Sequence, residues 1–150
     1  MALPMQRNRK RSRQAGVTLI EMLVVVAIIG LFVALVGPNL FKRADEAKVI
    51  TTRSQIDNFM TALGTYKLDT GVFPSTEQGL QALRVKPADA NQWNGPYMPK
   101  DIPKDSWGRD FIYRFPGEHQ TDEPEIVSLG ADGQPGGEGT NADILSWKSK

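Results

Sequence analysis

The pattern of apolar and polar positions changes sharply along this chain. An almost continuous apolar stretch runs from Val17 to Val36, and only Thr18, Glu21 and Gly30 interrupt it. Its length of about 20 residues is what a helix needs to cross the hydrocarbon core of a bilayer. Large apolar side chains would lie on every side of such a helix, so no face is suited to water. The stretch therefore predicts a membrane-spanning helix.

A pattern with helical spacing follows the apolar stretch. Gly37-Pro38 ends the stretch and predicts a kink or local unwinding, because Pro lacks a backbone donor. The helix is expected to continue to about Leu68, with one face on a globular domain, and Asp69-Thr70-Gly71 predicts its end. The apolar positions that recur along this second half are Leu40, Ala44, Ala47, Ile50, Ile56, Phe59, Met60, Leu63 and Tyr66.

The remaining chain predicts short elements separated by loops. Ser75 and Gln78 form the pattern of a capping box before a short helix that buries Leu80 and Leu83. The Pro- and Gly-rich segment 85–107 is expected to be ordered, because it carries the apolar anchors Trp93, Tyr97, Met98, Ile102 and Trp107. Residues 111–115, 125–129 and a short run near 144–147 predict three strands of a small antiparallel sheet. The expected fold class is α+β.

Charge is distributed unevenly, although the 18 basic and 17 acidic side chains leave a net charge of +1. Five of the basic residues precede the apolar stretch, with no acid among them, and such a segment stays in the cytoplasm. A secretory signal peptide also begins this way, but its apolar region is shorter and small residues follow it. The rest of the chain has 13 basic and 17 acidic residues, a net charge of −4. This balance argues against nucleic acid as a partner.

Two further counts limit the chemistry of the chain. It has no Cys, which excludes disulfides and thiol sites. Its one His, His119, lies in a polar segment without a nucleophile nearby in the sequence, and this predicts a surface residue rather than a catalytic one. Trp93, Tyr97 and Trp107 are expected to belong to the core, with a sugar-binding platform as the alternative. We therefore expect a protein that is not an enzyme.

Glu21 stands out because a carboxylate inside a membrane helix costs roughly 2.5–3.5 kcal/mol on insertion scales. Two interpretations are open from the residues alone. The carboxylate either lies near the membrane edge among lipid headgroups, or it has a partner that makes burial tolerable.

The start of the chain resembles the class III signal of type IV pilins and pseudopilins. Gly16 is followed by Val-Thr-Leu-Ile-Glu, after a short basic leader and before an apolar helix. The resemblance implies that a prepilin peptidase cuts between Gly16 and Val17 and methylates Val17, where the family more often has Phe. It also implies that Glu21 meets the amine of a neighbouring subunit, and Pro38 is grouped with it as an assembly residue. The implied organisation is a leader (1–16), a transmembrane assembly helix (17–38) and a periplasmic domain (39–150).

Three later blocks narrow the resemblance, and they lie at 69–80, 94–108 and 128–144. Together they resemble the major-pseudopilin family of type II secretion systems, known as protein G. The resemblance implies a pilin-like fold and a homopolymeric filament that drives folded exoproteins outward. It also implies a prepilin peptidase, minor pseudopilins, an inner-membrane assembly platform and an outer-membrane secretin as partners. The implied location is the inner membrane, crossed once, with the C-terminal domain in the periplasm.

The third block contains a candidate metal loop. From Leu129 to Ile144 it carries five Gly and oxygen donors but no His or Cys. Oxygen donors on a flexible loop suit Ca²⁺, whereas zinc prefers nitrogen or sulfur. From the residues alone a mobile, solvated loop is the favoured interpretation, and no EF-hand pattern is present. The resemblance implies calcium binding, with these expected ligands: the Leu129 carbonyl, the Asp132 and Asp143 side chains, and additionally Glu138, Thr140 and Asn141.

Two other functions remain open at this point. A major type IV pilin would share the N-terminal signal, but such pilins usually carry a C-terminal disulfide loop. A monomeric, membrane-tethered, calcium-dependent binding module is the alternative from another class. It would keep residues 1–16, whereas a pseudopilin loses them and crosslinks to its own copies.

Overall fold

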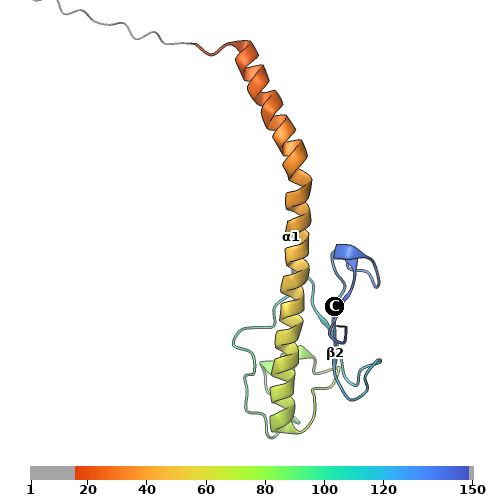
Figure 1. The fold of residues 1–150 in the computed structure, drawn as a ribbon. Helices are drawn as coiled ribbons and strands as arrows, with labels where there is room; N and C mark the ends of the chain where they lie inside the picture. Colours follow the sequence, from red (N-terminus) through yellow and green to blue (C-terminus); the bar gives the residue numbers. More distant parts are fainter. Residues whose placement is uncertain (1–15, 149–150) are drawn as a thin grey trace, which may run out of the picture. The chain divides into compact units, whose positions relative to one another are not determined.

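The computed structural model describes residues 16–148, and the chain divides into two compact units after Leu40. Figure 1 labels two of the elements, α1 and β2. Six elements follow one another along the described residues. They are the helix α1 (Leu19–Thr70), the short 3₁₀ helix η1 (Leu80–Leu83), the strands β1 (Ile112–Arg114) and β2 (Glu125–Ser128), the 3₁₀ helix η2 (Gly139–Asn141) and the strand β3 (Ile144–Leu145). The predicted α+β class with a small antiparallel sheet is confirmed.

In the unit that ends at Leu40, α1 exposes its apolar side chains on every side. The large ones between Leu19 and Val36 are 44–81% exposed. The helix is long and apolar enough here to cross a membrane. Pro38 lies inside α1, which continues through it, so the predicted local unwinding is not observed. A Pro removes one backbone hydrogen bond, and the turns on either side keep theirs.

The second unit has one hydrophobic core, built against one face of α1. Ile56, Phe59, Leu63 and Tyr66 are at most 2% exposed. They pack with side chains of η1 and all three strands, among them Leu83, Tyr113, Ile126 and Ile144. Of the predicted apolar stripe, Leu40, Ala44, Ala47 and Ile50 are exposed instead. This part of the prediction is wrong, because the loops and strands cover α1 only from about Val49 onward.

The end of α1 and the turn after it follow the predicted signals. α1 ends at Thr70, and Gly71 adopts φ 85° while its N–H donates to the Lys67 carbonyl at 2.8 Å. The predicted capping box is confirmed, because the Ser75 N–H donates to Gln78 Oε1 and the Gln78 N–H donates to Ser75 Oγ. The helix that follows is a single 3₁₀ turn that buries the two predicted leucines.

The sheet has the order β1-β2-β3, and both pairs are antiparallel. Tyr113 pairs with Ile126, and Ser128 pairs with Ile144. Each strand is shorter than predicted, and β3 contains only two residues. The irregular segment between η1 and β1 contributes core side chains as predicted, and Trp93 Nε1 donates to the Ala82 carbonyl at 2.9 Å. Trp93, Tyr97 and Trp107 thus belong to the core, as predicted.

Candidate functional site

The predicted processing and assembly residues lie at the beginning of the described chain. Gly16 and Val17 are exposed and precede α1, and the rest of the predicted leader lies outside the described residues. Glu21 lies in the first turn of α1, where its N–H donates to Thr18 Oγ1 at 3.3 Å. Within residues 16–148 the Glu21 carboxylate makes no hydrogen bond or ion pair. Pro38 is exposed as well.

The predicted metal loop runs from the end of β2, through η2, to β3. Its two arms meet where the Ala131 N–H donates to the Thr140 carbonyl at 3.0 Å. Gly130 adopts φ 62°, and a Cβ added there would lie 2.8 Å from the Asn141 carbonyl oxygen. A larger residue at position 130 would force the arms apart, so the sequence of the loop permits this close approach.

The predicted ligands differ in what they already bind. The Leu129 carbonyl accepts from the Gly133 N–H at 3.1 Å, and Asp132 Oδ1 accepts from the Gln134 N–H at 3.0 Å. Asp143 Oδ2 accepts from the Gly136 N–H at 2.9 Å. The other predicted ligands, Glu138, Thr140 and Asn141, lie in or next to η2. Two of them, Glu138 and Thr140, also line a cleft of about 950 Å³ beside α1, together with Asp143.

One observation favours a cation in this loop. Oδ1 of Asp143 is buried and has no hydrogen-bond partner among the described residues. A buried carboxylate oxygen without a partner is costly, and a bound cation would compensate for it. However, within residues 16–148 no three His, Asp or Glu side chains come together to hold a metal ion. A cation here would therefore need carbonyl or hydroxyl oxygens besides carboxylates, a mixture that Ca²⁺ accepts.

A turn at residues 105–109, which overlaps one of the three blocks but was assigned no site residue, connects this loop to the rest of the domain. Asp105 is 5% exposed, and its Oδ1 accepts from the N–H groups of Trp107 and Arg109. Its Oδ2 accepts from the Ser128 hydroxyl at 2.7 Å. The guanidinium of Arg109 then donates to two successive carbonyls of the predicted metal loop. Trp107-Gly108 belongs to one of the three blocks, but nothing in the sequence identified the bonding partners of Asp105 and Arg109.

A second missed cluster surrounds Glu125, which is 4% exposed on β2. Its Oε1 accepts from the backbone N–H of His119, whose Nδ1 lies 3.1 Å away and whose ring stacks on Trp147 at 4.5 Å. Burial raises the pKa of the Glu125 carboxyl, but backbone N–H groups of residues 118–120 and the His119 side chain outweigh it and lower the pKa overall. His119 is exposed, as predicted, and its ring also packs against Trp147.

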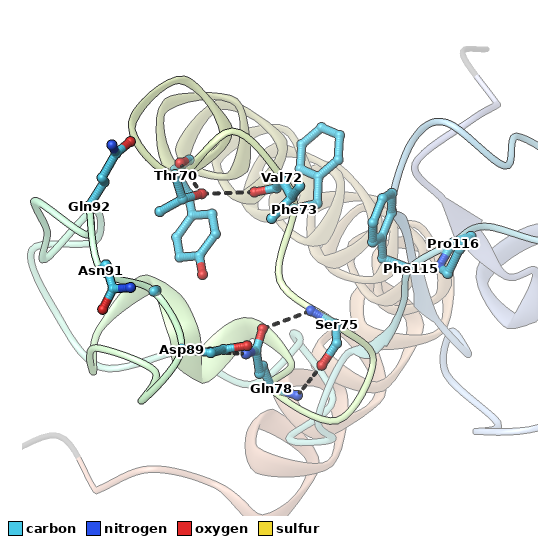
Figure 2. Close-up of a pocket in the computed structure, with 12 residues that line it drawn as sticks. Thr70, Val72, Phe73, Ser75, Gln78, Asp89, Asn91, Gln92, Phe115 and Pro116 are labelled. Carbon is cyan, nitrogen blue, oxygen red and sulfur yellow. Dashed lines mark hydrogen bonds between the residues drawn. The ribbon is translucent and has the colours of Figure 1, made fainter.

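A cleft of about 660 Å³ lies at the C-terminal end of α1 (Figure 2). Its polar groups largely bond to one another. Thr70 donates to the Val72 carbonyl, Ser75 and Gln78 form the capping box, and the Gln78 amide also donates to Asp89 Oδ1 at 2.7 Å. These bonds fasten the turn after α1 to the segment after η1. The polar groups of the cleft therefore have a structural role, because they hold its walls together.

Comparisons with known proteins agree on one family. The family model described as "Type II secretion system (T2SS), protein G" matches residues 39–147, and the model of the prokaryotic N-terminal methylation motif matches residues 11–37. The chain is 45% identical over 145 residues to the type II secretion system core protein G of Vibrio cholerae, covering 93% of this chain and 95% of that protein. It is 44% identical over 142 residues to core protein G of Pseudomonas aeruginosa, covering 92% and 98%.

A solved structure supports the same assignment. It is the crystal structure of the major pseudopilin from the type 2 secretion system of enterohaemorrhagic Escherichia coli, which matches with a TM-score of 0.61 at 33% identity. The match covers 73% of this chain and 95% of that one. Two features of the structure, the apolar part of α1 with its single carboxylate and the three-stranded sheet, agree with both family models. This chain belongs to the protein G family of type II secretion system pseudopilins.

Proposed function

We propose that this chain is the major structural subunit of a type II secretion pseudopilus. Many copies assemble through the helix that begins after Gly16, and growth of the filament drives folded exoproteins through an outer-membrane secretin. The observation that carries the proposal is the apolar part of α1, which is exposed on every side and contains one acid, next to a protein G domain. Family membership supports a structural rather than an enzymatic role.

The proposed location and partners follow from this role. The chain crosses the inner membrane once, with residues 39–150 in the periplasm. A prepilin peptidase removes residues 1–16, and minor pseudopilins and an inner-membrane assembly platform complete the machine. The match to the N-terminal methylation motif supports the processing step, because it includes both residues at the cleavage point.

The role proposed for Glu21 follows from charge neutralisation. Cleavage leaves an α-amine on Val17, with an unperturbed pKa of about 7.7–8.0, so it is largely charged at neutral pH. Glu21 lies four residues further, about 6 Å along the helix axis. In a filament of parallel helices, the carboxylate of one subunit meets the amine of the next at the same depth. Each charge then makes burial of the other tolerable.

Two measurements test this proposal. Mass analysis of the mature protein is expected to show loss of residues 1–16 and one added methyl group at Val17. Glu21→Ala is expected to abolish chemical crosslinking between copies of the protein in membranes. The control Glu46→Ala removes an exposed acid of the same helix and is expected to leave this crosslinking unchanged. An uncleaved, monomeric protein would instead favour the tethered binding module. The protein G relatives give no support to a type IV pilin.

We also propose that the loop from Leu129 to Asp143 binds Ca²⁺. The buried Oδ1 of Asp143, which has no hydrogen-bond partner among residues 16–148, supports this site, together with the Leu129 carbonyl and the exposed Asp132 carboxylate at the other arm. Glu138, Thr140 and Asn141 are further candidate ligands in or next to η2. Bound Ca²⁺ would supply positive charge that draws the two arms together, which stabilises a domain without disulfides.

Calcium titration of the purified full-length protein in detergent tests the loop. Saturating Ca²⁺ is expected to raise the melting temperature, since a ligand of the folded state stabilises it by mass action. Asp132→Ala is expected to remove most of this increase. The matched control Asp122→Ala removes an exposed acid outside the loop and keeps it. An Asp132→Ala protein that responds to calcium like the wild type would contradict the site.

A further inference from the structure

The backbone of the proposed metal loop is bound by the side chain of Arg109, which lies outside the loop in the sequence. Arg109 donates from Nη1 to the Gly130 carbonyl at 2.7 Å and from Nη2 to the Ala131 carbonyl at 3.0 Å. These two carbonyls lie between Leu129 and Asp132, the two ligands proposed on this arm. A planar guanidinium that binds two successive carbonyls fixes both their direction and their spacing.

We propose that Arg109 is a positioning residue, which holds the turn 129–133 in its ligand-presenting shape before a cation binds. The link to calcium rests on the metal site proposed above. The holding of the turn is a property of the protein alone, and it is tested separately below.

The turn itself is built around the guanidinium. Gly133 adopts φ 70°, and a Cβ placed on it would lie 2.6 Å from Arg109 Nε. The guanidinium therefore lies directly against the Gly133 backbone, and a side chain at this position would displace it. The Gly133 N–H closes the turn by donating to the Leu129 carbonyl at 3.1 Å. Backbone and side chain thus fix the same five residues from two sides.

Arg109 can hold the turn because its own backbone is fixed. Its N–H donates to Asp105 Oδ1 and its carbonyl accepts from the Asp105 N–H, both at 2.8 Å. Asp105 binds Ser128 on β2, and the neighbouring Ser106 bonds to Thr52 on α1, whose side chain is fully buried. The 105–109 turn is therefore fastened to the helix and the sheet, and Arg109 extends this fixed point to the loop.

The arrangement also leaves the acids of the loop available. Within residues 16–148, neither Arg109 nor the carboxylates of Asp132, Glu138 and Asp143 take part in an ion pair. The guanidinium is instead engaged by neutral carbonyls. A positive charge near the loop opposes a cation electrostatically, whereas a preformed turn favours it by lowering the ordering cost. A test must therefore keep the positive charge at position 109 and remove the pair of hydrogen bonds that the guanidinium donates to the two carbonyls.

Arg109→Lys does this in the full-length protein in detergent. In EDTA, we expect the amide protons of Ala131 and Gly133 to exchange about tenfold faster or more, since the turn opens locally. We expect Ca²⁺ to bind about 3–10-fold more weakly, because only the fraction of molecules with a formed turn binds. The control Arg114→Lys alters an exposed arginine that pairs with Glu118, and it is expected to change neither quantity.

Each outcome decides the proposal. Unchanged amide exchange in Arg109→Lys overturns it, and so does faster exchange with unchanged calcium affinity, since Arg109 would then be merely structural. If the wild type binds no Ca²⁺, the metal site proposed above is wrong, and the exchange rates alone show whether Arg109 holds the turn. Should Arg109→Lys not fold, Arg109→Gln, whose amide donates to one carbonyl, is measured in the same way.

Discussion

Between Leu19 and Val36 the large apolar side chains of α1 are 44–81% exposed, whereas Ile56, Phe59, Leu63 and Tyr66 of the same helix are at most 2% exposed. Both sets have the composition of a protein interior. The second set finds its interior within the domain, against η1 and the sheet. The first set needs surroundings that the chain does not provide, such as lipid or other copies of the helix. An apolar sequence therefore predicts that its side chains are buried, but not whether the same domain, lipid or another copy of the protein buries them.

The acids of the two regions differ in the same way. Glu125 is 4% exposed, and donors of residues 118–120 from its own chain surround it. Glu21 has no such partners among the described residues. The domain compensates its buried charge internally, whereas Glu21 is exposed, and the pairing proposed for it needs a second copy of the chain.

The largest effect on stability is expected when a side chain in the hydrophobic core of the domain is truncated. Leu63→Ala removes a fully buried side chain and is expected to destabilise the domain by about 2–5 kcal/mol, since it leaves a cavity. Thermal unfolding of the full-length protein in detergent measures it. Leu68→Ala, at a position 85% exposed on the same helix, and Leu23→Ala in the apolar part are the controls. A lowered melting temperature for Leu23→Ala would break the distinction between the two regions.

The next effect concerns the apolar part alone. Val26→Arg places a charge near the middle of the predicted span, at a cost of about 2.5–3.5 kcal/mol for insertion. We expect a large loss of protein from the membrane fraction, with an unchanged melting temperature of the remaining domain. Leu68→Arg, the same charge on the exposed face of the domain's helix, is expected to stay in the membrane. Equal membrane recovery of both variants would show that lipid does not surround residue 26.

A smaller effect concerns the internally compensated acid. Because the folded pKa of Glu125 is lowered, its stabilisation is fully present above the unfolded pKa of about 4.3 and is lost as the pH falls through the lower folded pKa. Glu125→Gln is expected to cost about 1.5–3 kcal/mol at neutral pH, the value of hydrogen bonds to a charged group. It should also flatten the loss of stability in acid.

The control for Glu125 lies two residues before it, in the turn that precedes β2. Glu123→Gln changes an exposed acid and is expected to alter the stability by less than about 0.5 kcal/mol. Chemical denaturation at several pH values from about 3 to about 7 gives the free energy of unfolding across the range in which Glu125 titrates. The pH dependence of this free energy distinguishes the two variants. Identical pH profiles for wild type and Glu125→Gln would refute internal compensation.

Local signals explain what could be predicted from the sequence. The apolar run, the stop at Gly71 and the Ser75–Gln78 capping box each depend on residues close in the chain, and each was found. The strands were located, but they are shorter than their apolar runs, because pairing with neighbours sets their ends. The exposed positions at Leu40 and Ile50 were misjudged for a related reason, since periodicity does not show how far a domain extends along a helix.

Long-range contacts explain what could not be predicted. Ser106 binds Thr52 across 54 residues, and Arg109 reaches Gly130 across 21. No short motif marks such pairs, because each residue type is common and only the fold brings them together. The calcium ligands stay a prediction for the same reason: the loop composition favours oxygen ligands, but the choice among them depends on how the two arms meet.

The smallest effects compare a glycine inside the domain's part of α1 with the glycine directly after its end. Gly64 lies inside the helix, and an added Cβ would meet nothing within 4 Å. Gly64→Ala is therefore expected to stabilise the domain by about 0.5–1 kcal/mol, because Ala loses less backbone entropy. Gly71 has equal space around it but adopts φ 85°, so Gly71→Ala is expected to destabilise by about 1–2 kcal/mol through backbone strain alone. Thermal unfolding of both variants should give shifts of opposite sign. Shifts of the same sign would mean that the helix does not end at Thr70, and the boundary of the region that the domain covers would have to be redrawn.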